Sequence, residues 1–173
     1  MRAGWLAGVA AGLCVGAAYA APVGASDPRL AAIGDIEQAH ADFVEHCAGC
    51  HGVRGNSAPA ALPELQGRVG WFLCMPQSRA YLIRLPNVAH SRISDNAQLA
   101  DMLNYMAFVV GGSSAPAHAQ PFTAQEVAQE RAHPLVSGSL TAERRHHALE
   151  AIKRCGAPAS LLLNYEGENK KRG

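Results

Sequence analysis

Apolar side chains recur with a helical period along two stretches of the chain. In residues 36–47 they are separated by three, four, one and three positions: Ile36, Ala39, Phe43, Val44 and Cys47. After Asp95 they recur at Leu99, Met102, Leu103, Met106 and Val110. This spacing places the apolar side chains on one face of each helix. Asp95 is suited to cap the second helix, and Gly111-Gly112 is suited to end it.

Shorter helices are predicted around these two. Asp27 precedes Pro28, and this pair is suited to begin a helix because proline is tolerated at the first helical position. Another short helix is expected at residues 79–85, with Pro86 ending it. No stretch shows the alternation of apolar and polar residues that is typical of a half-buried β-strand. The predicted fold class is therefore all-α.

The C-terminal third of the chain is predicted to be an extension. Residues 113–121 are small, polar and proline-containing, which indicates a linker. Residues 123–126 then form a capping box that opens a helix, and residues 141–153 are expected to form another amphipathic helix. The predicted organisation is a domain at residues 27–112, followed by a helical extension with a frayed tail at residues 122–173.

The N-terminus carries the pattern of an export signal. Arg2 precedes an uncharged stretch, residues 5–18, and Ala18-Tyr19-Ala20 is a small-x-small cleavage site. The uncharged stretch is shorter than the roughly 20 apolar residues that span a bilayer. Residues 1–20 are therefore predicted to be a signal peptide, and the mature chain is expected to be periplasmic and without a transmembrane anchor.

The charge balance narrows the classes of partner. Fifteen Lys and Arg residues stand against fourteen Asp and Glu residues, for a formal net charge of +1. A chain without a basic surplus is not expected to bind nucleic acid.

One short motif of cysteines and a histidine predicts a specific chemistry. Cys47-Ala48-Gly49-Cys50-His51 is C-x-x-C-H, the attachment motif of c-type haem. Two thiols at this spacing reach the two vinyl groups of one porphyrin and bond to them as thioethers. His51 is then held beneath the iron, where its Nε2 can bind the metal. The motif occurs once, so one covalently attached haem c per chain is expected.

Two other chemistries use cysteines at this spacing. A C-x-x-C pair can be a dithiol redox centre, but the β-α-β pattern typical of such proteins is absent here. It can also be half of a zinc site, but no second C-x-x-C or H-x-H pair follows at a suitable spacing. Haem attachment is the favoured interpretation.

Residues 35–112 resemble a class I c-type cytochrome. That family has a helix, then C-x-x-C-H, a loop, a short helix and a terminal helix that crosses the first. Phe43 and Tyr105 occupy the positions of an aromatic pair at this crossing, and Ala39 lies where the family usually has glycine. The resemblance implies helices wrapped round one haem.

A second segment, Pro63-Glu64-Leu65-Gln66-Gly67, resembles the P-x-L-x-G motif of the family. The resemblance implies that the carbonyl of Pro63 accepts a hydrogen bond from Nδ1–H of His51, which orients the ring toward the iron. It also implies that Leu65 lies on the haem.

The sixth iron ligand is where the resemblance is incomplete. The family places a methionine in the loop between the short and the terminal helix, but residues 86–94 contain none. His90 lies in this loop and is the favoured ligand. Met75 is the alternative, while Met102 and Met106 are more typical of core residues. A five-coordinate iron is also left open.

Several other residues stay without an assigned role. Cys74 and Cys155 remain after haem attachment, and whether they pair is left open. Tyr81 is expected to wall the haem or fill the core. His146 and His147 are expected on a solvated helix face rather than in a metal site.

These patterns predict an electron carrier. A single haem c would cycle between Fe(II) and Fe(III) during transient encounters with redox partners such as a dehydrogenase and an oxidase. Electron transfer is favoured over catalysis. The alternatives are a haem enzyme or a gas-binding or gas-sensing protein with an open distal site, or a dedicated haem subunit of a larger dehydrogenase complex.

Overall fold

The computed structural model describes residues 27–56 and 62–163, so the predicted signal peptide lies outside the described residues. Up to residue 104 its helices are η1 (Pro28–Ala32), α1 (Ile36–His46), α2 (Ala48–His51), η2 (Val69–Cys74), α3 (Pro76–Arg84), α4 (Pro86–Ala89) and α5 (Asn96–Asn104). They are followed by η3 (Tyr105–Val110), η4 (Gly112–Ser114), α6 (Ala124–Arg131), α7 (Leu140–Cys155) and η5 (Ala159–Leu162). No strand occurs within these two ranges, and the all-α prediction is confirmed.

Helices α1 and α5 begin at the predicted caps. The carboxylate of Asp35 accepts hydrogen bonds from the main-chain N–H groups of the first turn of α1, and Asp95 does the same for α5. Helix α3 begins three residues earlier than predicted. Pro76 is its first residue, a position where the missing N–H of proline is not needed.

The crossing of α1 and α5 is closely packed. Ala39 is 1% exposed, so a small residue lets the two helices approach. Next to it, Phe43 is fully buried, and its ring centroid lies 5.8 Å from that of Tyr105 at an interplanar angle of 46°. The expected aromatic contact is therefore present, and Tyr105 begins a π-helical turn, η3, that continues α5.

A buried carboxylate links the same two helices. Asp42 is 4% exposed, and its two oxygens accept hydrogen bonds from Gln38 of α1 and Gln98 of α5, each at 2.9 Å. Both oxygens are thus satisfied, which a buried charge requires.

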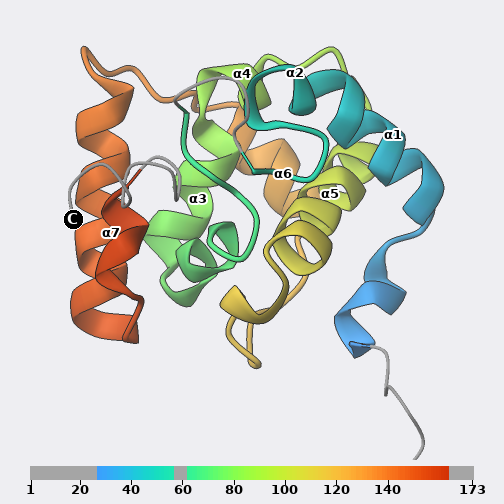
Figure 1. Ribbon diagram of the computed structural model, residues 1–173. Helices are drawn as coiled ribbons and strands as arrows, with labels where there is room; N and C mark the ends of the chain where they lie inside the picture. The colour runs from blue at the N-terminus through green and yellow to red at the C-terminus, as the bar shows by residue number, and fades with distance from the viewer. Residues whose placement is uncertain (1–26, 57–61, 164–173) are drawn as a thin grey trace, which may run out of the picture.

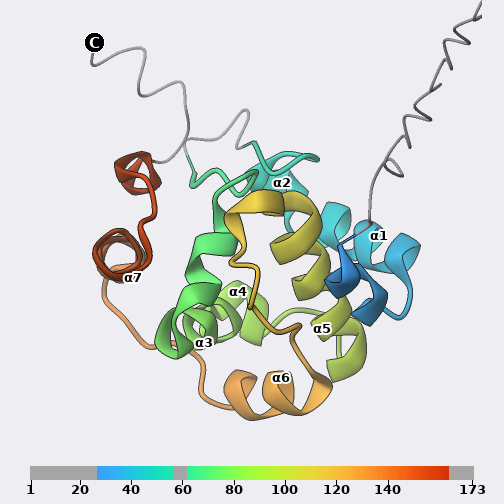
Figure 2. The same cartoon turned by 90° about the horizontal axis from the view of Figure 1, so that it is seen from below.

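Helix α6 packs against α3 and α5 (Figures 1 and 2). Arg79 of α3 lies over the ring of Phe122, 4.0 Å from its centroid, and binds the carboxylate of Glu126 at 2.5 and 2.7 Å. The side-chain amide of Asn104 donates to the carbonyl of Phe122 at 3.0 Å and accepts from its N–H at 2.6 Å. These contacts tie the start of α6 to two helices of the preceding region.

The segment predicted to be a linker is packed. Ser114, Ala115 and Ala119 are buried, and one hydrophobic cluster runs across residues 113–121 into α6 and α7. The boundary between a domain at residues 27–112 and an extension at residues 122–173 stays a prediction.

Helix α7 stands at one side of the molecule, with α3 between it and α5 (Figures 1 and 2). Cys155 at its end forms a disulfide with Cys74 at the end of η2, with the two Cα atoms 6.4 Å apart. After α7 the chain turns at Gly156, and η5 places Leu161 fully in the core. The disulfide pairing that the sequence left open is thus present. In the part of the chain described, no helix is long and apolar enough to cross a bilayer.

Removing the disulfide should destabilise the fold. The bridge joins residues 81 positions apart, so its loss frees a large loop in the unfolded chain. We expect the double variant Cys74→Ala/Cys155→Ala to lose about 2–5 kcal/mol of unfolding free energy, measured by guanidinium denaturation.

Arg154→Ala is a matched control because Arg154 lies on the last turn of α7, where its side chain forms a partly exposed ion pair with Glu150. It should cost about 0.5 kcal/mol or less. Equal unfolding midpoints for the double variant and the native chain would contradict the prediction.

Candidate functional site

The C-x-x-C-H residues lie where α1 turns into α2. The N–H of Cys47 donates to the carbonyl of Phe43 at 2.9 Å, and the N–H of His51 donates to the carbonyl of Cys47 at 2.9 Å. The two thiols therefore flank one helical turn that ends at the imidazole. Cys47 is half-buried and Cys50 is exposed, and both sulfurs are free.

The imidazole of His51 contacts the P-x-L-x-G segment. Its Nδ1 lies 2.8 Å from the carbonyl oxygen of Pro63. A carbonyl oxygen only accepts, so Nδ1 carries the proton and donates it. Nε2 is then left with its lone pair, which is the arrangement a metal-binding histidine needs.

A backbone turn places Pro63 beside His51. The carbonyl of Gly55 accepts hydrogen bonds from the N–H groups of Leu65 and Gln66 at 2.7 and 2.9 Å, which returns the loop to the haem motif. Gly55 has a φ of +74°, and a Cβ there would meet Cγ1 of Val110 at 2.5 Å and Cβ of Leu65 at 3.2 Å. Only glycine fits this place without displacing its neighbours.

The electrostatic setting favours a neutral imidazole. Burial lowers the pKa of His51; the hydrogen bond to Pro63 opposes this, and the nearby charge of Arg144 adds to the lowering. Burial, with a smaller contribution from Cys50, raises the pKa of Cys47 to about 11. A dithiol redox centre needs a thiolate near neutral pH, so this setting does not suit that alternative.

The donor set fits haem c. Two free thiols on one helical turn can bond to the vinyl groups of one porphyrin, and a neutral imidazole with a free Nε2 is a ligand for its iron. Leu65, two residues after Pro63, is half-buried and packs against the edge of the hydrophobic core.

Comparison with known proteins gives relatives of one kind. The chain is 31% identical over 138 residues to a cytochrome c-552 of Thermus thermophilus, covering 68% of this chain and 93% of the relative. It is 32% identical over 127 residues to a second Thermus thermophilus cytochrome c-552, covering 64% of this chain and 97% of the relative. The chain belongs to the class I c-type cytochromes. No family model and no solved structure matches it.

As a c-type cytochrome the chain carries covalently bound haem c and transfers electrons. The alternatives, a haem enzyme, a gas-binding protein or a subunit of a larger dehydrogenase complex, are not favoured by these relatives.

The two predicted sixth ligands of this cytochrome lie on different segments, at the end of α4 and directly before α3. His90 is exposed at the end of α4, where it lines a hollow of about 460 Å³ together with Glu45, His46 and Arg92. Met75 is half-buried and directly precedes α3. Two further methionines are buried in the core: Met102 and Met106.

The sequence pattern led to a wrong expectation for the surroundings of one histidine. His147 is half-buried, with its ring centroid 4.4 Å from that of Tyr81 and its Nδ1 3.1 Å from Oγ of Ser78. The expectation of a solvated face was wrong for His147, because Ser78 and Tyr81 of α3 contact its ring, while the adjacent His146 is exposed. The available signal was spacing: His147, Ala151 and Cys155 follow one another at intervals of four on one helix face.

Substituting Gly55 should weaken the hydrogen bond between His51 and Pro63 that orients the imidazole. Gly55→Ala adds a methyl group that presses on Leu65 and Val110, so the carbonyl of Pro63 should shift and its hydrogen bond weaken. We expect a loss of about 2–4 kcal/mol in unfolding free energy. The midpoint potential should also rise, because a less basic imidazole stabilises ferric iron less.

Gly67→Ala is the matched control for this variant. Gly67 has a similar φ of +64°, but a Cβ there meets no atom within 4 Å. It should lose only the roughly 1 kcal/mol of left-handed backbone strain and keep its potential. Equal potentials in all three proteins would show that the Gly55 turn does not position the imidazole.

Proposed function

We propose that this cytochrome is a periplasmic one-electron carrier in which Cys47 and Cys50 hold a single haem and His51 binds its iron through Nε2. The observation that carries the assignment of His51 is its hydrogen bond to Pro63, because this bond leaves Nε2 free and fixes the plane of the ring. The haem supplies the redox chemistry, a one-electron change of its iron.

The chain's own residues hold and insulate the redox centre. The thioether anchors keep the cofactor from dissociating, and the carbonyl of Pro63 increases the basicity of the imidazole toward iron. His51 and Leu65 are half-buried, and they would limit the access of water to one face of a bound haem.

The disulfide supports export to an oxidising compartment. A bridge such as Cys74–Cys155 forms and persists outside the cytoplasm, in agreement with the signal-peptide pattern of residues 1–20. In the periplasm this cytochrome would exchange electrons with a dehydrogenase and an oxidase or similar partners. Such encounters bury little surface and are transient.

For the sixth ligand, His90 and Met75 stay predictions. His90 has the expected place in the chain, between the short and the terminal helix, but it is exposed. Met75 is half-buried beside the Cys74 bridge.

The haem content of purified protein tests the assignment of the anchors. We expect one haem per chain by pyridine haemochrome, not extractable by acid acetone. Cys47→Ala/Cys50→Ala should retain no covalent haem, because no thiol is left at the motif.

Cys74→Ala/Cys155→Ala is the control, since it removes the same number of sulfurs outside the motif. It should retain covalent haem. Haem that is extractable from the native chain, or covalent haem in the Cys47/Cys50 double variant, would refute the proposed anchors.

A further inference from the structure

The turn that follows Pro63 ends at a buried arginine. The carbonyl of Leu65 accepts hydrogen bonds from the main-chain N–H groups of Arg68 and Val69, both at 3.0 Å, and η2 begins directly after Arg68. The side chain of Arg68 is only 9% exposed. A guanidinium so far removed from water needs partners for its charge and its N–H groups, and those partners show what it holds.

The first partner is the carboxylate next to Pro63. Nε of Arg68 lies 3.0 Å from Oε2 of Glu64, whose side chain is 12% exposed. An ion pair this well shielded keeps its geometry, because separating the two charges would leave each of them buried and unpaired. The carbonyl of Pro63 belongs to the planar peptide group that joins Pro63 to Glu64. The ion pair therefore restrains the peptide group whose oxygen accepts from Nδ1–H of His51.

The second partner lies in the C-terminal region. Nη1 of Arg68 donates to the main-chain carbonyl of Ser160 in η5 at 2.8 Å, although the two residues are 92 positions apart. Helix η5 is itself held in place, because Leu161 is fully buried and Arg144 of α7 donates to the carbonyls of Leu161 and Leu163 at 2.8 and 3.3 Å. One guanidinium thus joins the Pro63 turn to a fixed point far along the chain.

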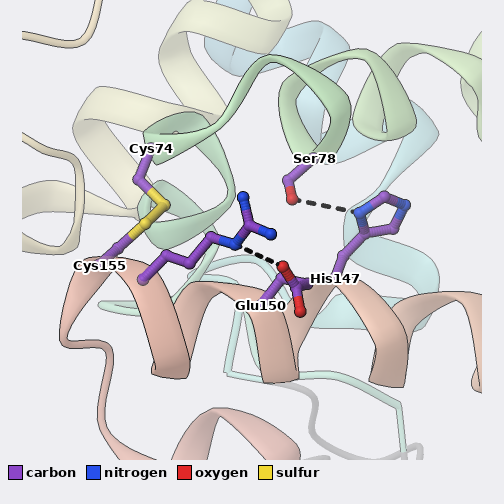
Figure 3. Close-up of a disulfide and its surroundings, with 6 residues drawn as sticks. Cys74, Ser78, His147, Glu150 and Cys155 are labelled. Carbon is purple, nitrogen blue, oxygen red and sulfur yellow. Dashed lines mark hydrogen bonds and ion pairs between the residues drawn. A yellow bond between two sulfur atoms is a disulfide. The ribbon is translucent and has the colours of Figure 1, made fainter.

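The disulfide joins the same two segments at a second place. Helix η2 starts after Arg68 and ends at Cys74, and the partner of Cys74 is Cys155 at the end of α7, shortly before η5 (Figure 3). Residues 68–74 are therefore attached at both ends to residues 155–160, by the guanidinium at one end and by the disulfide at the other. A shift of the Pro63 turn against the C-terminal region would have to break the contacts of Arg68.

From these contacts we infer that Arg68 is a positioning residue for the redox centre. By binding Glu64 and the carbonyl of Ser160 at the same time, it holds the carbonyl of Pro63 on Nδ1–H of His51. The inference rests on the proposed role of His51 as an iron ligand. A hydrogen bond to the second nitrogen of such a ligand sets both the orientation of the ring and its basicity toward the metal. The C-terminal region thereby contributes to the midpoint potential of the haem.

The variant Arg68→Lys tests this role at constant charge. Lysine keeps the positive charge, but its side chain ends in one nitrogen and lacks the planar fork whose Nε and Nη1 each take an acceptor. The hydrogen bond at Pro63 should loosen. The Nδ1 proton of His51 should then exchange with solvent faster, measured by NMR, and the midpoint potential should rise because a less basic imidazole stabilises ferric iron less.

The double variant Glu64→Gln/Arg68→Gln removes both charges together. The net charge of the chain stays the same and no charge is left buried without a partner, so this variant should fold. Its proton exchange and its midpoint potential should change in the same direction as in Arg68→Lys. Native values of both quantities in the two variants, together with a lower unfolding free energy, would show that Arg68 is only structural and would overturn the inference.

Arg79→Lys is the matched control. Arg79 also binds a glutamate and a main-chain carbonyl at once, those of Glu126 and Gln120, but it joins α3 to the start of α6. This variant should lose stability and keep the native exchange rate of the His51 proton and the native potential. A shift as large as that of Arg68→Lys would mean that any loosening of the fold alters the potential, which would also overturn the inference.

Haem content separates this inference from the proposed function. Every variant should hold one covalent haem per chain by pyridine haemochrome, because the thiols of Cys47 and Cys50 are untouched. A native chain without covalent haem would refute the proposed function and, with it, this inference. Full haem content with a native potential in Arg68→Lys and in the double variant would refute the role of Arg68 alone.

Discussion

The hydrogen bond from Nδ1–H of His51 to the carbonyl of Pro63 is the contact on which the site depends. Without a partner for Nδ1, the imidazole could carry its proton on either nitrogen and turn about its side-chain bonds. A single neutral hydrogen bond contributes only about 1 kcal/mol. The chain therefore supports it with a second layer, in which the carbonyl of Gly55 accepts hydrogen bonds from Leu65 and Gln66 and holds the Pro63 segment in place.

The features that sequence predicts well here are those set by near neighbours. Asp35 and Asp95 cap their helices within the first turn, and the C-x-x-C-H residues lie on one turn. Even the contact between His51 and Pro63 spans only twelve residues and has a motif at each end. In each case the chain geometry over a few residues fixes the outcome, so a pattern in the sequence is sufficient.

The features that sequence could not give depend on how distant helices pack. Cys74 and Cys155 are 81 residues apart, and nothing in their local sequence specifies the bridge. His147 was expected on a solvated face because the charged residues around it are typical of one, and only the docking of α7 on α3 buries it. Residues 113–121 have a linker composition, yet small side chains such as Ala115 and Ala119 are also those that pack closely.

The weak apolar face of α7 explains why its attachment is covalent and polar. Ala148 and Ala151 are the buried residues of this helix, and two methyl groups contribute only about 1–2 kcal/mol by burial. Ile152 adds a partly buried side chain, and α7 packs mainly on η2 and η5. The Cys74–Cys155 bond and the hydrogen bond between His147 and Ser78 act at two points eight residues apart on one side of the helix. Two fixed points determine both the rotation and the tilt of a rod, so the side of α7 that carries His147 has a single orientation toward α3.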